Sequence, residues 1–359
     1  MSAEQTLPSP LASLFARLDA AGARRPEAGR AVSDFGDARA EAAAVADAAG
    51  TVVAPLTHLA VLDASGADAA SFLHNQMTND INHLAPDQWL RAAWCSAKGR
   101  MYTTFAIWRG ADAGTYRLRF SADQMAFIKK RLTMFVLRAK VTLADRSDDV
   151  AVFGLAGARA AELVAGLGLA VPEVGKTAAG AVGEVLRIDA ARFELAVPAD
   201  QAAATWDRLA AVARPVGARA WHLLDVRAGV PHLSAATQEA FVPQMANFER
   251  IGGVSFHKGC YPGQEIVART QYLGKVKRHM YQATAAADLA PGAELFSSAL
   301  PDQSCGQVVI SAPSPAGGFE VLAVIQENAL DASIHSSGEA PVELAAPRLP
   351  AYMSEAPAA

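Results

Sequence analysis

The sequence predicts an α+β protein with more than one domain and a small C-terminal β-barrel. Three observations lead to this prediction. The chain of 359 residues is longer than one ordinary hydrophobic core supports. Short strand and helix patterns alternate between residues 51 and 245, and strand-like runs punctuated by Gly and Pro follow one another beyond His279.

The composition indicates a globular protein. Hydrophobic residues make up 52% of the chain and charged residues 19%, which excludes disorder over most of its length. The 32 Lys and Arg against 36 Asp and Glu give a net charge of −4, so the chain is no polyelectrolyte. The longest apolar run, residues 150–158, falls short of the roughly 18 residues of a membrane helix. The N-terminus carries no secretory signal pattern, so we expect a cytoplasmic protein.

The first half of the chain shows its elements in order. Residues 1–50, rich in Ala, Arg, Pro and Gly, predict a loosely ordered lead-in with at most one or two amphipathic helices, as in LASLFARLDAA. LTHLAVLDASG then predicts a strand that enters a turn, and DAASFLHNQM predicts a helix. The apolar runs RAAWC and MYTTFAIW, joined by SAKGR, predict a β-hairpin, and TYRLRF alternates as a half-buried strand does.

A helix with a capping-box pattern, Ser121 and Gln124, comes next. Its apolar positions recur at helical spacing, at Met125, Ile128, Leu132 and Phe135. A second round follows, with a VAVFGL strand, a GARAAELVAGLG helix, VLRIDA and RFELAVP strands, and a helix from about Gln201. Aligning VLDASGADAASFL with VFGLAGARAAELV matches Gly66 with Gly157, which suggests two related halves.

These patterns divide the chain beyond the lead-in into four parts. Residues 51–245 form two related α+β subdomains, residues 246–280 form a segment of distinct composition, residues 281–350 form the β-barrel, and residues 351–359 form a disordered tail.

The three cysteines differ in their surroundings. Cys95, Cys260 and Cys305 lie far apart and form neither a C-x-x-C pair nor a zinc-type Cys/His pattern, which argues against a disulfide framework or a conventional iron–sulfur cluster held by this chain alone. A lone cysteine is usually an inert core residue, as we expect for Cys95 and Cys305. Cys260 instead lies in HKGCYPGQE, whose Gly and Pro residues exclude a regular helix or central strand.

The chemistry expected of Cys260 follows from its neighbours. Lys258 and the start of a short helix, EIVARTQYL, favour the thiolate, so we expect an accessible and oxidisable thiol. None of the eight histidines forms an HxxxH or HExxH pair, and only His257 is near this loop, so we expect no stably bound metal.

Positive charge gathers around the same loop. Residues 247–280 carry six basic side chains against Glu249 and Glu265, and these basic residues are Arg250, Lys258, Arg269, Lys275, Lys277 and Arg278. Such a stripe attracts an anion, for example a carboxylate, a phosphate or an RNA backbone, although a solvated helix face also explains it.

The motif KGCYPGQEIVAR resembles the signature of the YgfZ folate-binding family, relatives of the aminomethyltransferase of glycine cleavage. Further segments agree in the same order, and the resemblance covers about residues 51–350: GADAASFLHNQMTNDI, WCSAKGRMYTTFAIW, WHLLDVRAGVP and FVPQMANFERIGGVSF. The resemblance implies ferredoxin-like halves around a central channel that binds tetrahydrofolate or a derivative. It also implies a C-terminal barrel and a role in maintaining iron–sulfur enzymes, including those that thiolate tRNA.

The resemblance also implies site residues. The loop residues carried over are Lys258, Gly259, Cys260, Tyr261, Gly263, Gln264 and Glu265, with Cys260 as the functional thiol. Trp221 stands where the family places an aromatic folate contact, and a second aromatic of some members falls at Leu59. The thiolate could hold iron or a cluster transiently, form a mixed disulfide with a client enzyme, or attack a folate-borne one-carbon unit.

Two other classes of function stay open. A folate-dependent aminomethyltransferase would carry an aspartate pair where this chain has Thr103 and Thr104, and a hydroxyl cannot serve as a carboxylate base. An RNA-binding module would use the basic stripe with Tyr261 and Tyr272, but the chain contains no RNA-binding motif and its pI is about 6.1. We therefore expect folate and iron–sulfur client enzymes as partners, with no direct nucleic acid, no membrane and no independent turnover.

Overall fold

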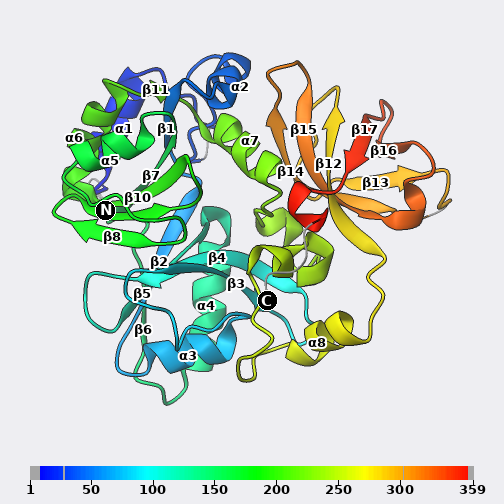
Figure 1. Ribbon diagram of the computed structural model, residues 1–359, viewed down its shortest axis with the longest axis horizontal. Helices are drawn as coiled ribbons and strands as arrows, with labels where there is room; N and C mark the ends of the chain where they lie inside the picture. The colour runs from blue at the N-terminus through cyan, green and yellow to red at the C-terminus, as the bar shows by residue number, and fades with distance from the viewer. Residues whose placement is uncertain (1–8, 27–28, 302, 355–359) are drawn as a thin grey trace, which may run out of the picture.

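Two antiparallel-rich sheets and a closed β-barrel are arranged around a common centre (Figure 1). The computed structural model describes residues 9–26, 29–301 and 303–354. The mixed α+β architecture and the C-terminal barrel confirm the predicted fold class. No helix in these ranges combines the length and the apolar character that a membrane crossing requires.

The first sheet has five strands in the order β3-β4-β5-β2-β6. These are β3 (Trp89–Cys95), β4 (Met101–Arg109), β5 (Thr115–Ser121), β2 (Leu59–Ser65) and β6 (Thr142–Asp145). Helices α3 (Ala69–Gln76) and α4 (Met125–Val136) cover one face, where Phe72, Leu73 and Ile128 are buried against the strands. The predicted hairpin is confirmed, because β3 and β4 pair antiparallel around the SAKGR turn.

The second sheet has six strands in the order β11-β1-β7-β10-β9-β8. These are β11 (Arg214–Pro215), β1 (Thr51–Pro55), β7 (Val150–Gly157), β10 (Arg192–Pro198), β9 (Gly183–Arg187) and β8 (Thr177–Gly180). Helices α5 (Ala160–Gly166) and α6 (Ala199–Ala210) pack on its outer face. Strand β1 lies between β7 and β11, so the first strand of the chain completes the second sheet.

The two halves repeat each other at the turn between strand and helix. Gly66 and Gly157 both have positive φ, +129° and +112°, and a Cβ on either would lie 2.1 Å from a main-chain oxygen. The residues that precede the following helices, Asp68 and Arg159, have nearly identical backbone angles. The sequence alignment that suggested related halves therefore corresponds to one local structure used twice, with glycine required at both turns.

The two sheets turn their other faces toward each other. Val61, Trp108 and Val152 belong to one buried cluster that contains residues of both sheets. Helix α7 (Ala218–Ala228) contributes Trp221 to this cluster and also packs against the barrel, so it connects the second sheet with the barrel (Figure 1).

The barrel closes in the order β12-β15-β14-β13-β16-β17. Its strands are β12 (Arg278–Ala285), β15 (Phe319–Gln326), β14 (Gly306–Pro313), β13 (Glu294–Ser297), β16 (Ile334–Ser336) and β17 (Glu343–Arg348). Cys305 is buried in its apolar core, as predicted for an inert thiol.

The expectation of a loose lead-in is wrong for the described part of residues 1–50. Helix α1 (Ala12–Ala20) buries Leu11, Leu14 and Leu18 in the core of the second half. Helix α2 (Ala38–Ala46) buries Glu41, whose carboxylate accepts hydrogen bonds from the main chain of Phe35 and Gly217. The amphipathic pattern LASLFARLDAA did predict the helix, and its three leucines form the buried stripe, but the pattern could not show that the stripe packs into the core of the second half.

Two smaller predictions also need correction. The capping box at Ser121 does not form, because the Ser121 hydroxyl donates to Asp123 and the Gln124 amide donates to the main-chain oxygen of Tyr102. The predicted tail begins with an ordered turn, since residues 351–354 form a 3-10 helix and the Tyr352 hydroxyl donates to the Gly229 oxygen over 2.7 Å. Residues 355–359 of that tail lie outside the described residues.

Candidate functional site

The signature loop around Cys260 lies between the first sheet and the barrel. Helix α8 (Gln264–Tyr272) follows it, as predicted, and the chain then enters the barrel at β12 (Figure 1). Cys260 is exposed, which agrees with the expected accessible thiol, whereas Cys95 is buried in β3 and burial raises its pKa. Of the three thiols, Cys260 is therefore the one that a client protein or reagent can reach.

Lys258 anchors the loop to the end of helix α3. Its side chain is only 9% exposed, and its ammonium donates to the main-chain oxygens of His74 and Met77. The ammonium also lies 5.0 Å from the centre of the Tyr261 ring. Burial lowers the pKa of Lys258 to about 8, while the charges of Asp80 and Cys260 act in the opposite direction. Lys258 thus attaches the loop to the end of α3 and places a positive charge near Cys260.

A main-chain contact fixes the other side of the loop. Gly263 has φ +79°, and a Cβ there would lie 2.3 Å from the Ser96 oxygen and 2.7 Å from the Gly99 Cα. The turn between β3 and β4 therefore packs directly against the backbone that starts α8. The SAKGR turn and the cysteine motif, which are far apart in the sequence, form one rigid platform.

The remaining motif residues divide into buried and exposed ones. Tyr261 is buried, and burial raises its pKa. Gly259 and Glu265 are exposed, and Gln264 is half-buried with its amide 3.5 Å from the Gly259 oxygen. The structure thus brings the whole predicted motif together, with Gly259, Cys260 and Glu265 on the surface.

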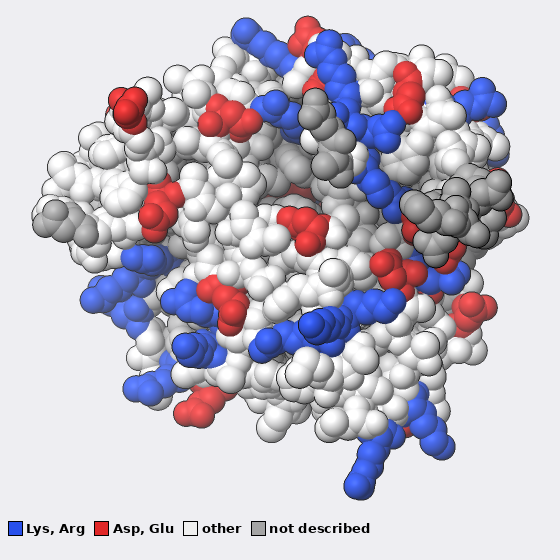
Figure 2. Space-filling model, turned by 180° about the vertical axis from the view of Figure 1, so that it is seen from behind, with Lys and Arg blue, Asp and Glu red and all other residues white. Residues whose placement is uncertain are grey.

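The basic stripe does not form a continuous surface. Lys258 is buried, and Arg278 donates to the Ser304 oxygen and the Gln326 side chain. Arg269, Lys275 and Lys277 are exposed. On the face shown in Figure 2, acidic side chains lie between the basic ones, so no large area of one sign appears there. Some of the basic side chains of this segment therefore make contacts inside the protein, and others face solvent.

The second predicted site, around Leu59 and Trp221, lies in the centre of the molecule. Both side chains belong to the apolar cluster between the two sheets. Leu59 borders a cavity of about 520 Å³ that is also lined by Leu56, His58 and Val152. Trp221 is 3% exposed and its ring packs on Gly154 of β7, where a Cβ would lie 2.5 Å away. Leu59 thus reaches a cavity, whereas Trp221 supports the strand that forms the cavity wall.

A smaller polar cavity of about 50 Å³ lies beside this cluster and was not apparent in the sequence. It is lined by charged residues from three elements, Arg91 of β3, Arg119 of β5 and Glu194 of β10. Arg119 and Glu194 form an ion pair of 3.0 Å between the two sheets, and burial raises the pKa of Glu194. In the sequence these charged residues alternate with apolar ones, as in any half-buried strand. That they face each other depends on how the two sheets pack, which the sequence does not show.

Thr103 and Thr104 stand on β4 close to this centre. Thr103 is fully buried, and the Thr104 hydroxyl lies 3.4 Å from the Pro231 oxygen. Neither position offers a carboxylate, so the strand provides no base of the kind an aminomethyltransferase would use there.

Comparison with known proteins gives consistent results. A family model described as the GCVT N-terminal domain matches residues 17–179. The tRNA-modifying protein YgfZ of Yersinia pseudotuberculosis is 32% identical over 246 residues, which are 65% of this chain and 71% of that protein. The tRNA-modifying protein YgfZ of Escherichia coli O157:H7 is 33% identical over 234 residues, 64% of this chain and 70% of that protein.

A solved structure shares the architecture of nearly the whole chain. The crystal structure of glycine cleavage system aminomethyltransferase T from Bartonella henselae superposes with a TM-score of 0.77 at 16% sequence identity. The match covers 94% of this chain and 96% of that one. At this identity the likeness establishes a common fold and leaves the chemistry to the residues of the site.

Proposed function

Because the chain belongs to the YgfZ family, whose relatives above are named tRNA-modifying proteins, we propose that it supports the assembly or repair of iron–sulfur enzymes, including enzymes that thiolate tRNA. The working group is the thiol of Cys260. The observation that carries this proposal is an exposed cysteine on a loop that is fixed on both sides, by Lys258 and by Gly263.

A fixed, exposed thiol suits transfer between proteins. A rigid platform presents the sulfur in one position, so a partner does not have to order the loop when it binds. The thiolate can then coordinate iron for a short time or exchange with a disulfide of a client enzyme. The neighbouring surface offers exposed apolar side chains for such a contact, among them Ile266, Tyr272 and Leu273 of α8 and the turn after it.

We further propose that the chain binds tetrahydrofolate in the cavity beside Leu59. The volume of about 520 Å³ lies within the range of small-molecule sites. Leu56, Leu59 and Val152 provide an apolar wall for a flat ring. Arg30 at the same cavity pairs with Asp148 over 2.6 Å, and a carboxylate of the glutamate tail would share or replace that partner. The residues present therefore fit this ligand, with Trp221 supporting the wall from behind.

The thiol role is tested by complementation. The chain and its Cys260→Ser variant are expressed in a bacterium that lacks its own family member, and an iron–sulfur-dependent tRNA thiolation is measured. We expect the wild type to restore thiolation and the variant to fail at an unchanged unfolding temperature, since Cys260 is exposed. Cys305→Ala, which removes a buried thiol, serves as the control and should retain function if it folds. Equal rescue by wild type and Cys260→Ser would refute the role of the thiol.

Folate binding is tested separately by calorimetry with tetrahydrofolate. Arg30→Gln should weaken binding several-fold, because it removes the charge at the cavity, whereas Arg159→Gln on the surface of α5 should leave binding unchanged. No binding by the wild type, or equal binding by both variants, would remove tetrahydrofolate from this cavity without affecting the proposal for Cys260.

A further inference from the structure

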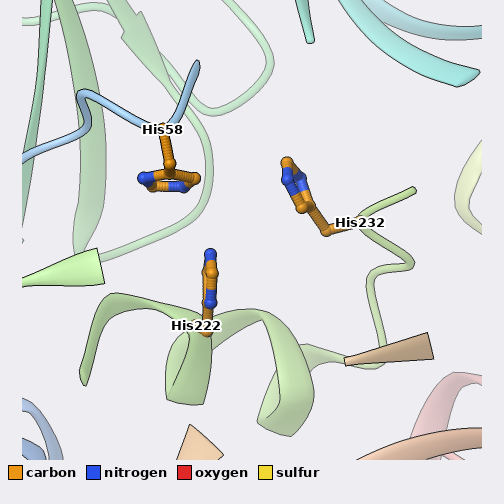
Figure 3. A group of neighbouring side chains, drawn as sticks. All are labelled: His58, His222 and His232. Atoms are coloured by element: carbon orange, nitrogen blue, oxygen red, sulfur yellow. The ribbon is translucent and has the colours of Figure 1, made fainter. Parts of the chain in front are cut away.

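Three histidines from separate parts of the chain converge at the centre of the molecule (Figure 3). His58 lies in the turn between β1 and β2, His222 lies on α7, and His232 lies in the segment after α7. One ring nitrogen of each lies within 4.8 Å of those of the others. The ring centres of His58 and His222 are 4.8 Å apart, and His232 is 5.7 and 5.6 Å from these two.

Contacts of the main chain and of neighbouring residues hold the backbone at each of the three histidines. The His58 oxygen accepts a hydrogen bond of 2.9 Å from the amide of Ala122. His222 follows Trp221, whose ring is fixed against β7. His232 follows Pro231, whose oxygen lies 3.4 Å from the Thr104 hydroxyl. The fold therefore fixes the backbone positions from which the three rings converge.

Two ring nitrogen atoms of the cluster have no hydrogen-bond partner within the described part of the chain. His58 Nδ1 and His222 Nε2 are buried and accept or donate no hydrogen bond there. A buried polar atom without a partner costs about 1–3 kcal/mol, so a ligand that satisfied these two atoms would stabilise the protein. Burial also lowers the pKa of all three histidines, to about 4 for His222 and His232, so the rings are neutral at pH 7 and have lone pairs available.

The charged groups that face the cluster are themselves paired. Arg119 faces His58 and His232 and forms an ion pair with Glu194, and Arg219 faces His222 and forms an ion pair with Asp288. Asp225 faces His222 and His232. Asp225 also pairs with Arg192, over 3.0 Å. The surroundings of the rings thus contain paired charges of both signs, with Asp225 favouring a bound cation and Arg119 and Arg219 opposing it.

We propose that His58, His222 and His232 form a binding site for a divalent first-row transition-metal ion, with Zn²⁺ as the best match. Neutral imidazole is the preferred nitrogen ligand of Zn²⁺, and three histidines form an established ligand set that leaves a fourth position open. Ligand nitrogens around a tetrahedral zinc ion lie about 3.4 Å apart, so small rotations of the three side chains bring them into range. No sequence motif indicates this site, because its ligands come from positions 58, 222 and 232.

The site would lie between the two central cavities. His58 lines the cavity of about 520 Å³, and His232 lines the smaller one beside Arg119 and Glu194.

The test measures binding of Co²⁺ and Zn²⁺ to the folded, metal-free protein. The protein carries Cys260→Ser, so that the exposed thiol cannot bind the ion and a failure of the proposed thiol function has no influence. We expect one Co²⁺ per chain with the visible absorption of a four- or five-coordinate site, displacement by one Zn²⁺, and a higher unfolding temperature with metal. His222→Gln and His232→Gln should each weaken binding by more than about tenfold, the smallest loss usual for a disturbed metal site.

The matched control is His83→Gln, which changes a histidine whose side chain is 85% exposed and should bind metal like the parent protein. His232→Gln borders a cavity and tests the site even if the substitution of His222 impairs folding. Absence of metal-dependent stabilisation in the parent protein would overturn the proposal and leave water as the partner of the rings. Binding that persists unchanged in both His222→Gln and His232→Gln would show an adventitious surface ion and would equally overturn it.

Discussion

At the scale of single residues, the position of Cys260 depends on a glycine three residues later. Gly263 combines a positive φ with a main-chain contact of a kind that no side chain permits. Any Cβ at this position would push α8 away from the turn between β3 and β4, and the thiol would move with it. The glycine therefore sets the position of the sulfur although it carries no chemistry.

We predict that Gly263→Ala destabilises the protein by about 2–4 kcal/mol, from a strained φ together with a steric clash. Gly168→Ala is the matched control, because Gly168 has φ +82° but nothing within 4 Å of a Cβ, so only the strain remains, about 1–2 kcal/mol. Urea unfolding of both variants measures the difference. Equal losses would show that the contact with Ser96 and Gly99 relaxes without cost.

The raised pKa of Glu249 should make the free energy of unfolding depend on pH. Burial raises its pKa to about 7 from an ordinary 4.5, and its Oε2 atom has no hydrogen-bond partner within the described residues. The unfolded chain ionises first, so stability falls as the pH rises from about 4.5 to about 7 and stays lower above that. The loss is on the order of 2–3 kcal/mol.

Glu249→Gln should remove this part of the pH dependence, which unfolding experiments at pH 5 and pH 8 measure. Glu339→Gln, at an exposed position, should keep the profile of the wild type. A Glu249→Gln protein with an unchanged difference between the two pH values would contradict the assignment.

At the scale of elements, buried ion pairs join the two sheets. Glu184 of β9 is 4% exposed and accepts hydrogen bonds from the Trp108 indole at 2.6 Å, the Ala111 amide at 2.9 Å and the Arg117 guanidinium at 2.9 Å. One carboxylate of the second half thus satisfies three donors of the first half. The relative position of the halves, and with it the shape of the central cavities, depends on this contact.

Glu184→Ala should destabilise the protein by about 3–5 kcal/mol, because it removes the shared acceptor of the Trp108 indole, the Ala111 amide and the Arg117 guanidinium, which keeps only Asp63 at 3.4 Å. The control Glu162→Ala removes an exposed carboxylate that pairs with Arg159 within α5, and its stability should equal that of the wild type. Thermal and urea unfolding measure both. A small loss in Glu184→Ala would mean that water replaces the carboxylate between the sheets.

Local sequence patterns predicted most helices and strands. Where such a prediction was wrong, contacts of neighbouring residues explain why. The helix from Met125 and the hairpin around SAKGR were predicted correctly, since each repeats a periodic apolar pattern over several residues. Phe135 was predicted on the buried stripe of that helix but is 42% exposed, because it lies in the last turn, where α4 extends beyond the sheet. The capping box at Ser121 failed because Asp123 competes for the hydroxyl.

At the scale of the whole molecule, the N-terminal segment is part of the core. We predict that Leu14→Ala, at a side chain 1% exposed, destabilises the protein by about 2–5 kcal/mol. Ser13→Ala, one position earlier on the exposed side of α1, should have no measurable effect. A Leu14→Ala protein as stable as Ser13→Ala would restore the expectation of a loosely attached lead-in.

The candidate site residues differ in how well the sequence alone could identify them. Residues 258–265 form a contiguous motif, so the pattern of letters identified the loop and its exposed cysteine. Arg119 and Glu194 are 75 positions apart, and His58 lies far along the chain from His222 and His232, so no local pattern contains this information. Trp221 was predicted to contact folate, which stays a prediction, and the structure shows that its ring packs on Gly154.

The place of β1 in the second sheet has a consequence for synthesis on the ribosome. The first strand to leave the exit tunnel pairs with β7 and β11, and its partner in β11 follows about 160 residues later. At about 5–20 residues per second, the nascent strand waits roughly 8–30 seconds until both edges are paired, and both edges stay unpaired until β7 follows about 100 residues after β1. During that interval the growing chain is exposed to chaperones or to pairing with another chain, and the first sheet, which needs only residues 59–145, can fold ahead of it.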